Sequence, residues 1–452
     1  MAIGTAALLG GCSPPGAPIT ISAPGAGAFE LSLAVRDGGF VTAWHDTRQG
    51  NERLYLRLLD GSGQPAGPER QLTNGATHAY EPDIQVAGNT AFIAWYDKDA
   101  AGHLTARLGA WSLAGQPLWS RALSAPTDEG RNPVIALTRG RIFGAWLEYG
   151  RTRSAPARSA PQTSAADAAA TATATDAAAR FPDAQDVTQD TMIWSGWYDL
   201  QGHVLSAPRA TAPAGRDTWN LNADADAAGS VYLVFDARVD TRAKELFLDR
   251  ISADTGDTPG PGHVTQLSGN AGNPGRPTRP GADAGSPDRL TRLSADDGFD
   301  STYPDVAIDD QDRRVALTWF DTRDGNEQVY LYAGPLDGFG THPIDATARR
   351  VTHTRGNAIG AYLAWNGPRI GLAWCDDSVG QDEIYFEDFD LAAVPLEAPR
   401  RLTYNRTSSL IPAIVPWRDG FALAWNEYFG GSAAAHSVNA HSDAAFMRVH
   451  SP

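Results

Sequence analysis

A repeat of about 50 residues is the feature that most constrains how this chain can fold. Trp44, Trp95 and Trp146 follow one another at intervals of 51 residues, and Trp374 and Trp425 are separated by the same interval. A period of this length indicates one supersecondary unit copied several times. Seven short apolar segments end on the repeating aromatic: GFVTAW (39–44), TAFIAW (90–95), RIFGAW (141–146), SVYLVF (230–235), RVALTW (314–319), RIGLAW (369–374) and GFALAW (420–425).

The residue before each of these aromatics is small or β-branched. These residues are Ala43, Ala94, Ala145, Val234, Thr318, Ala373 and Ala424. Strands that are apolar on both faces are typical of sheets packed face to face, and a small side chain leaves room for the aromatic ring of a neighbouring sheet. We therefore expect the units to stack on one another.

Each unit contains four strands. The first unit gives FVTAWHD, a DTRQGN turn, RLYLRLL, a Gly-rich turn and PERQLT, and EPDIQV (81–86) then opens the next unit. Residues 302–352 and 358–403 repeat the scheme. Short strands that recur at a fixed phase with turn residues between them are typical of propeller blades. The sequence predicts an all-β fold, a single seven-bladed β-propeller of four-stranded antiparallel blades.

The ends of the chain predict how the ring closes. The last unit ends with AFMRVHSP (445–452), a third strand with no outer strand after it. Residues 17–22, APITIS, precede the first unit with the phase of an outer strand. We expect this N-terminal strand to pair with the last blade, because closure removes open sheet edges.

Two insertions interrupt the period. Residues 151–190, rich in Ala, Thr, Ser and Pro, lie between the second and third strands of the third unit. Residues 254–288, rich in Gly, Pro and Asp, lie between the third and fourth strands of the fourth unit. Neither composition can bury a core, so both are expected to be disordered loops.

The wording of the repeat, W-x-D-x-R-x-G-N-x-x-(L/V)-Y, then D-x-x-G and R-x-(L/V)-T, resembles TolB-type and WD-like propeller repeats. The resemblance covers nearly the whole chain outside the insertions. It implies a propeller architecture and leaves the activity open, because such repeats occur in binding scaffolds, peptidase gating domains and carbohydrate enzymes.

The N-terminus and the charge indicate a cellular setting. Residues 6–12, AALLGGC, resemble the lipobox of bacterial lipoprotein signal peptides, which implies cleavage before Cys12 and lipid on its sulfur. The alternative is an ordinary apolar N-terminus with a chance cysteine. We expect residues 1–12 to be a signal peptide and 13–452 the propeller, anchored at the bacterial cell envelope. The net charge of −16 argues against nucleic acid as a partner.

The repeated turn residues have a structural interpretation. Asp46, Arg48, Gly50 and Asn51 recur as Asp321, Arg323, Gly325 and Asn326. We expect Asp to accept backbone N–H groups, Arg to pair with a nearby carboxylate, and Gly or Asn to take positive φ.

Residues that do not repeat are better candidates for a site. The links between blades are expected to ring the mouth of the central channel with carboxylates, arginines and aromatics, which suit a polar ligand such as a glycan or a peptide terminus. The predicted ligand-binding residues are Glu81, Asp83, Arg131, Arg216, Trp219, Asp300, Tyr303, Asp305, Arg355 and Arg406.

A glycan-cleaving enzyme is the rival hypothesis. Sialidases are propellers that use three arginines and a Tyr/Glu pair, and Arg131, Arg216 and Arg355 with Tyr303 could fill those roles. The Asp-box S-x-D-x-G-x-T-W of sialidases is absent, as is an Arg-Ile-Pro stretch. We therefore favour a noncatalytic scaffold that recognises an envelope protein or a polysaccharide.

Other chemistry has little support in the sequence. The histidines show no H-x-x-x-H or Cys/His cluster, and no phosphate-binding glycine motif occurs, so we expect no cofactor and no metal. The acidic residues Asp376, Asp377, Asp382 and Glu383 could hold calcium, but we expect solvated surface charge there. Cys375 is expected to be a small buried residue, and the protein to be a monomer.

Overall fold

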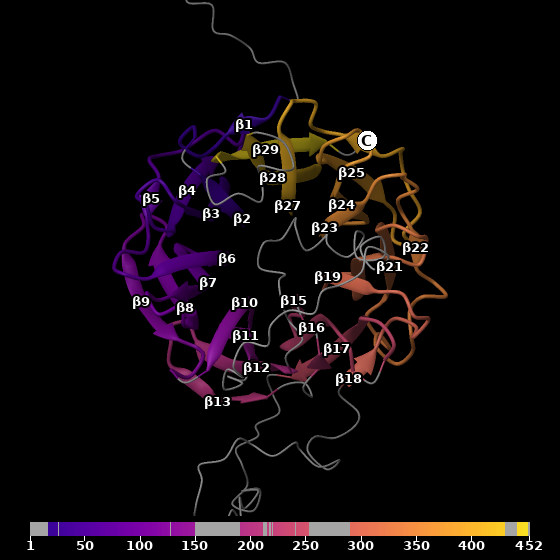
Figure 1. Cartoon of the computed structure of the whole chain (residues 1–452), viewed down its shortest axis with the longest axis horizontal. Coiled ribbons are helices and arrows are strands. Elements are labelled where there is room, and N and C mark those ends of the chain that lie inside the picture. Colours follow the sequence, from indigo (N-terminus) through magenta and orange to yellow (C-terminus); the bar gives the residue numbers. More distant parts are fainter. Residues whose placement is uncertain are drawn as a thin grey trace, which may run out of the picture.

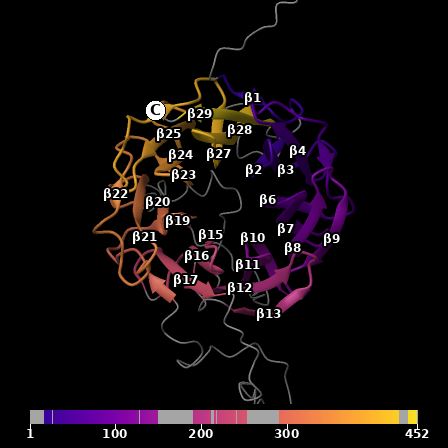
Figure 2. The same ribbon diagram turned by 180° about the vertical axis from the view of Figure 1, so that it is seen from behind.

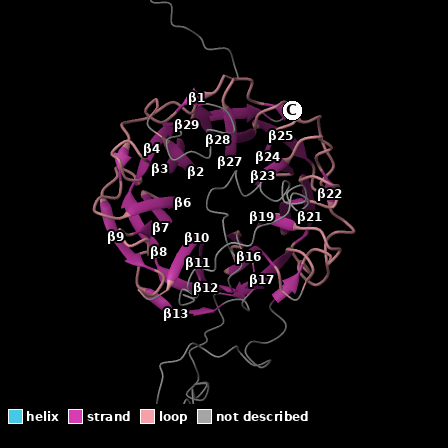
Figure 3. Cartoon of the chain, in the orientation of Figure 1, coloured by secondary structure: helices cyan, strands magenta, loops and turns pink. Residues whose placement is uncertain are grey.

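A computed structural model describes residues 17–149, 190–210, 215–252, 290–429 and 441–450, apart from the single residues 26, 127, 217, 219 and 240. Its regular elements are all β-strands, and the described residues contain no helix (Figure 3). The strands form seven separate antiparallel sheets, which confirms the predicted fold class.

Six of the blades are built from strands that are consecutive in the chain and run from the centre of the ring outward. Blade one contains β2 (Ala28–Arg36), β3 (Gly39–Asp46), β4 (Arg53–Asp60) and β5 (Arg70–Gln71). Blade two contains β6 (His78–Ala87), β7 (Thr90–Lys98), β8 (Leu104–Ser112) and β9 (Pro117–Ala122). Blade three contains β10 (Glu129–Thr138), β11 (Arg141–Tyr149), β12 (Asp190–Asp199) and β13 (Val204–Ala210), with the short β14 (Gly215–Arg216) paired to β12. Blade four contains β15 (Leu221–Ala225), β16 (Ser230–Ala237), β17 (Glu245–Ser252) and β18 (Leu290–Arg292). Blade five contains β19 (Ser301–Asp309), β20 (Arg314–Asp321), β21 (Gln328–Pro335) and β22 (Arg349–Arg350). Blade six contains β23 (Ala358–Asn366), β24 (Arg369–Asp376), β25 (Glu383–Phe389) and β26 (Arg400–Arg401).

Blade seven joins the two ends of the chain. It contains β27 (Ser408–Trp417), β28 (Gly420–Phe429) and β29 (His441–His450), with β1 (Ile19–Thr20) as its outer strand. Ile19 lies opposite Phe446 and Thr20 opposite Ala445, so the predicted closure by the N-terminal strand is confirmed. Figures 1 and 2 show the blades in chain order around the ring, with β1 beside β29.

The blades pack as the small and large residues of the repeat predict. Six of the seven aromatics share a buried cluster with the small residue of the blade before them: Trp44 with Ala424, Trp95 with Ala43, Trp146 with Ala94, Phe235 with Ala145, Trp319 with Val234, and Trp425 with Ala373. Such burial of large apolar side chains between sheets is the main stabilising contribution in a fold of this kind.

The insertions occur where the sequence placed them. The first lies between β11 and β12, and the second between β17 and β18. The described residues do not include 151–189, 254–288 or Cys12. The predictions of disordered insertions and of a lipid anchor therefore concern residues outside the described part of the chain. Within the described part of the chain, no helix is long and apolar enough to cross a membrane.

Candidate functional site

The repeated turn residues have the predicted structural role. Asp46 accepts the backbone N–H of Arg48 at 2.8 Å, and the Arg48 guanidinium pairs with Asp46 and Glu69. In blade five, Arg323 pairs in the same way with Asp321 and Asp345. The glycines of both turns have φ of 83° and 90°. These residues therefore hold the turn of each blade.

The same carboxylate has a second role that the sequence did not reveal. Five repeat tryptophans donate their indole N–H to the acidic side chain two residues further on: Trp44 to Asp46, Trp95 to Asp97, Trp146 to Glu148, Trp319 to Asp321 and Trp425 to Glu427. The W-x-D/E pattern thus satisfies a buried indole donor that would otherwise cost free energy.

Several predicted site residues lie in the inner strands and not in the links between blades, which corrects the sequence prediction. Glu81 and Asp83 lie in β6, Arg131 in β10, and Tyr303 and Asp305 in β19. The prediction was wrong because the inner strands begin several residues earlier than their apolar patterns suggest.

A β-bulge near the start of six inner strands explains this irregular pattern. The register shifts at the same point in β2, β6, β10, β19, β23 and β27. A residue with positive φ lies in each bulge: Glu30, Glu81, Asn132, Tyr303, Gly360 and Ile411. Bulges re-aim side chains and are common beside functional sites. A left-handed conformation is uncommon for non-glycine residues and costs of order 1 kcal/mol each.

Asp83 and Asp305 hold neighbouring blades together. The Asp83 carboxylate accepts the backbone N–H of Ile135 in blade three at 2.8 Å, and Asp305 accepts that of Leu363 in blade six at 2.8 Å. Burial raises the pKa of Asp83 to about 6 and that of Asp305 to about 7. These two predicted ligand-binding residues therefore join adjacent inner strands.

An aromatic run crosses three blades on the face that carries the turns between second and third strands and the links between blades. We call this side the link face. Tyr428 of blade seven packs against Phe29 at 5.8 Å between ring centroids, and Phe29 stacks on His45 at 5.5 Å. His45 then meets Tyr80 of blade two at 5.4 Å. Tyr80 in turn stacks on Tyr96 at 5.2 Å, and both Phe29 and Tyr80 remain partly exposed.

Three polar contacts lie beside this aromatic run. Glu30 Oε2 lies 3.2 Å from His45 Nδ1, and Glu81 Oε1 accepts from the Tyr96 hydroxyl at 3.4 Å. In blade three, the Arg131 guanidinium donates to the Tyr149 hydroxyl at 2.6 Å and lies 4.2 Å from the centre of its ring. We call this set, with the aromatic run, the axial cluster: Phe29, Glu30, His45, Tyr80, Glu81, Tyr96, Arg131, Tyr149 and Tyr428.

Electrostatic coupling shows that side chains from different blades converge. The negative charge of Glu81 in blade two helps to raise the pKa of Tyr149, Tyr303 and Tyr362, which belong to blades three, five and six. Burial is the main cause for all three and raises the pKa of Tyr149 to about 12. The structure therefore brings Glu81, Arg131 and Tyr303 of the predicted set together, with hydroxyls that stay protonated at neutral pH.

The remaining predicted residues lie elsewhere. Asp300 accepts the backbone N–H of Lys244 at 2.8 Å and holds a turn. Arg355 and Arg406 are exposed in links between blades. The backbone of Arg216 lies in β14, whereas its side chain and the whole of Trp219 lie outside the described residues. Of the three arginines of the sialidase hypothesis, Arg131 thus lies in the axial cluster and Arg355 in an exposed link, and the side chain of Arg216 is not described.

Sequence reasoning missed Phe29, His45, Tyr96, Tyr149 and Tyr428. One available signal was the position after the repeat aromatic, which varies from blade to blade as His45, Tyr96, Leu147, Asp236, Phe320, Cys375 and Asn426. A second was the proline that follows four of the bulge residues, at Pro82, Pro133, Pro304 and Pro412.

The acidic residues of blade six are not solvated, which corrects a second prediction. Asp376, Asp382 and Glu383 are buried. Glu383 accepts from Arg401 at 2.6 Å, and Asp377 accepts the backbone N–H of Asn357 at 2.7 Å. The prediction was wrong because these carboxylates are acceptors inside the blade. No group of three or more His, Cys, Asp or Glu residues able to hold a metal ion occurs among the described residues. Cys375 is buried, as expected.

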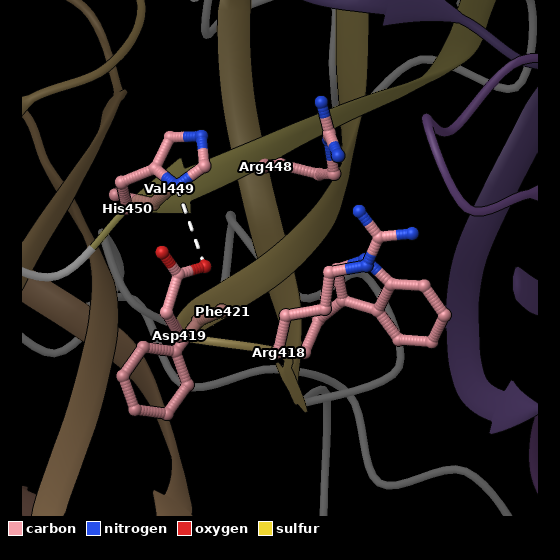
Figure 4. A pocket seen from close by; sticks show the side chains of 7 residues that line it. Arg418, Asp419, Phe421, Arg448, Val449 and His450 are labelled. Atoms are coloured by element: carbon pink, nitrogen blue, oxygen red, sulfur yellow. Dashed lines mark ion pairs between the residues drawn. The ribbon is translucent and has the colours of Figure 1, made fainter.

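A pocket of about 410 Å³ lies on blade seven at the side opposite the link face (Figure 4). Trp417, Arg418 and Asp419 line it from the turn between β27 and β28. His450 lies 3.6 Å from Asp419, and both side chains are more than 70% exposed. A pair this exposed contributes little energy. This pocket is therefore a weaker candidate than the axial cluster.

No family model matches this chain, and no curated protein matches it. Among solved structures, the polysaccharide lyase Uly1 matches with a TM-score of 0.50 and 9% sequence identity, over 92% of this chain and 89% of that chain. Trypanosoma rangeli sialidase matches with a TM-score of 0.42 and 9% identity, and its complex with the inhibitor DANA with 0.42 and 8%; both matches cover 87% of this chain and 57% of that chain. At these identities the lyase match shows only that the chain shares a propeller fold with it.

Proposed function

We propose that this protein is a noncatalytic recognition scaffold that binds a glycan at the axial cluster on its link face. The observation that carries the proposal is the continuous aromatic run from Tyr428 through Phe29, His45 and Tyr80 to Tyr96. Its two partly exposed rings, Phe29 and Tyr80, belong to the same cluster as the carboxylates of Glu30 and Glu81. Stable sites combine apolar or aromatic walls with a few placed polar groups, and this cluster has both.

The chemistry of the cluster favours a sugar. A pyranose presents C–H groups that pack on aromatic faces and hydroxyls that bond to carboxylates and guanidinium groups. Phe29 and Tyr80 supply partly exposed rings, and Glu30, Glu81 and Arg131 supply the polar groups. A protein partner is the alternative occupant of the same face.

The protonation of the tyrosines supports binding over cleavage. A tyrosine nucleophile or base needs a lowered pKa, whereas burial raises the pKa of Tyr149 to about 12 and that of Tyr303 well above its usual value. One contact favours the enzyme as a second candidate. The Tyr96 hydroxyl donates to Glu81, and a Tyr/Glu pair is what a sialidase-like mechanism requires.

Binding to defined oligosaccharides tests the proposal directly. Calorimetric titration with a panel of neutral and acidic oligosaccharides is expected to identify a ligand. We expect Tyr80→Ala to weaken it about tenfold, because one aromatic contact is worth about 1 kcal/mol. Tyr404→Ala is the matched control, because Tyr404 is 73% exposed and lies outside the cluster.

Three results would contradict the proposal. The first is equal loss of binding in both tyrosine variants, and the second is the absence of binding to every oligosaccharide tested. The third is the appearance of cleavage products by mass spectrometry, together with their loss in Glu81→Gln, which would establish the glycan-cleaving alternative.

The setting of the scaffold is also a proposal. We propose a TolB-type propeller that acts as a monomer at the bacterial cell envelope, anchored through lipid on Cys12. The support is the AALLGGC stretch and the repeat wording. Mass spectrometry of the protein expressed in bacteria should find diacylglycerol on the Cys12 peptide, and an unmodified peptide would contradict the anchor.

A further inference from the structure

A second pocket lies at the outer part of the ring between blades five and six. It has a volume of about 470 Å³, within the range of small-ligand sites. Arg349 and Arg350 of β22 line one side, and Trp374, Asp376 and Tyr385 of blade six line the other. We call it the blade-six pocket. None of its lining residues belongs to the axial cluster.

Blade six lacks the arginine that blades one and five carry at the place where this pocket lies. Arg48 of blade one lies 4.3 Å from the ring centre of Tyr55, and Arg323 of blade five lies 5.0 Å from that of Tyr330. In blade six the equivalent position is Ser378, four residues after Trp374, and Ser378 lines the pocket. The space that a guanidinium fills over the tyrosine in the other two blades is therefore left open over Tyr385.

Trp374 lines this space and carries a buried donor without a partner. Trp374 is only 2% exposed, and its indole N–H has no hydrogen-bond partner. Five other repeat tryptophans donate to the carboxylate two residues further on. In blade six that carboxylate, Asp376, accepts the backbone N–H of Ser378 at 2.8 Å, as its counterparts do in blades one and five, and it also accepts from the Thr354 hydroxyl at 3.2 Å. An unsatisfied buried donor costs about 1 to 3 kcal/mol, which a ligand oxygen would recover.

The walls of the pocket combine both charges with an aromatic face. Arg349 and Arg350 bring positive charge, with Arg350 paired to Asp324 at 2.7 Å, and Asp376 brings negative charge. Glu387 is a second carboxyl, and burial raises its pKa to about 7. The rings of Trp374 and Tyr385 are stacked at 5.9 Å. The carboxylates disfavour a simple anion, and the two arginines disfavour a simple cation. A hydroxyl group suits the site best, because it accepts from an indole N–H and donates to a carboxylate.

We propose that the blade-six pocket binds one neutral pyranose unit. A ring hydroxyl accepts the Trp374 indole N–H and donates to Asp376, and the C–H face of the sugar packs on Tyr385 where the arginine lies in blades one and five. The site is separate from the axial cluster, and the inference goes beyond the function proposed for that cluster. The proposal for the blade-six pocket is independent of the proposal for the axial cluster, because the two sites share no residues.

The test uses methyl glycosides of common neutral hexoses, with acetate, inorganic phosphate and guanidinium as charged probes. Binding is followed through the indole N–H signals of the full-length protein labelled with nitrogen-15. We expect one methyl glycoside to shift the Trp374 signal at millimolar concentration. Ser378→Arg should refill the space and weaken binding at least tenfold, and Trp374→Phe should weaken it about tenfold through the lost hydrogen bond.

Matched variants separate this site from the fold and from the axial cluster. Trp319→Phe makes the same change in blade five and should leave the glycoside-induced shift of the Trp374 signal unchanged. Thermal unfolding of each variant establishes that it is folded. The proposal is overturned if no glycoside shifts the Trp374 signal, if only a charged probe does, or if Ser378→Arg binds as the parent does. Loss of binding in Tyr80→Ala with retention in Ser378→Arg would also overturn it and would place the sugar at the axial cluster.

Discussion

Blades five and six share one strand plan, yet they differ around the repeat tryptophan. In blade five the Trp319 indole N–H donates to Asp321, and Arg323 joins that carboxylate to Asp345 beside Tyr330. In blade six Trp374 has no acceptor and Ser378 replaces the arginine. One blade is filled at this point by its own side chain, and the other has a pocket of about 470 Å³.

The difference shows where to look for function in a repeat protein. A residue that recurs in most copies serves the packing of those copies, as Asp46 and Asp321 do through the indole and turn hydrogen bonds. A copy that loses such a residue keeps the cost of the unmet interaction. The sequence around it then becomes a candidate for ligand binding.

Arg323→Ser should give the largest effect, because it makes blade five resemble blade six. Asp321 is fully buried and would lose its cation while keeping its charge. Removing one partner of such a pair typically destabilises a protein by about 3 kcal/mol or more. Urea unfolding should show this loss at pH 7.

The matched variant in blade six is Ser378→Ala. Ser378 contributes a backbone N–H to Asp376, which the substitution keeps. The free energy of unfolding should therefore change by about 0.5 kcal/mol or less. Equal losses in the two variants would mean that the arginine is not what distinguishes the blades.

The junction between the two blades predicts a smaller effect that depends on pH. Asp305 of blade five accepts the backbone N–H of Leu363 in blade six, and burial raises the pKa of Asp305 to about 7. A carboxyl with a raised pKa in the folded state contributes stability that is complete at low pH and is lost as pH rises through that pKa. Between pH 5.5 and 8 this loss amounts to about 2 kcal/mol.

Asp305→Asn should remove that part of the pH dependence, because an amide oxygen can still accept the Leu363 N–H. Urea unfolding at pH 5.5 and at pH 8 measures the change in the free energy of unfolding. The variant should lose less stability than the parent between these two pH values. Asp337→Asn is the control. Its carboxyl is exposed and Arg313 lowers its pKa, so the slope over this range should not change. An unchanged slope in Asp305→Asn would show that other carboxyls carry it.

The architecture was predictable because it depends on a pattern repeated seven times. The aromatic and small residues predicted the stacking of the blades, and residues 17–22 predicted the closure of the ring. The pairing of β1 with Phe446 and Ala445 confirms the closure. Each copy repeats the same physical constraint, so chance variation in one copy does not obscure it.

The candidate sites were predictable only in part. Glu81, Arg131 and Tyr303 were identified, but as members of links, because the bulges hide the alternation of the inner strands. Phe29 and His45 are cross-strand neighbours within blade one, and Tyr428 joins them only through the closure of blade seven onto blade one. In the blade-six pocket, Ser378 in place of the arginine is visible in the sequence, but the contact of Asp376 with Thr354 is contained in no local pattern.

The smallest effect isolates a single N–H group. Trp319→Phe and Trp374→Phe remove the same atoms from equivalent buried positions. The free-energy cost of the cavity that each substitution leaves should therefore be nearly equal in the two variants. Trp319→Phe also takes a donor from the buried Asp321, whereas Trp374→Phe removes an N–H that has no partner. We expect the blade-five variant to be less stable than the blade-six variant by about 1 kcal/mol in urea unfolding without ligand. The reverse order would mean that the Trp374 indole has an acceptor in solution, and the pocket would then lose the donor that makes it a sugar site.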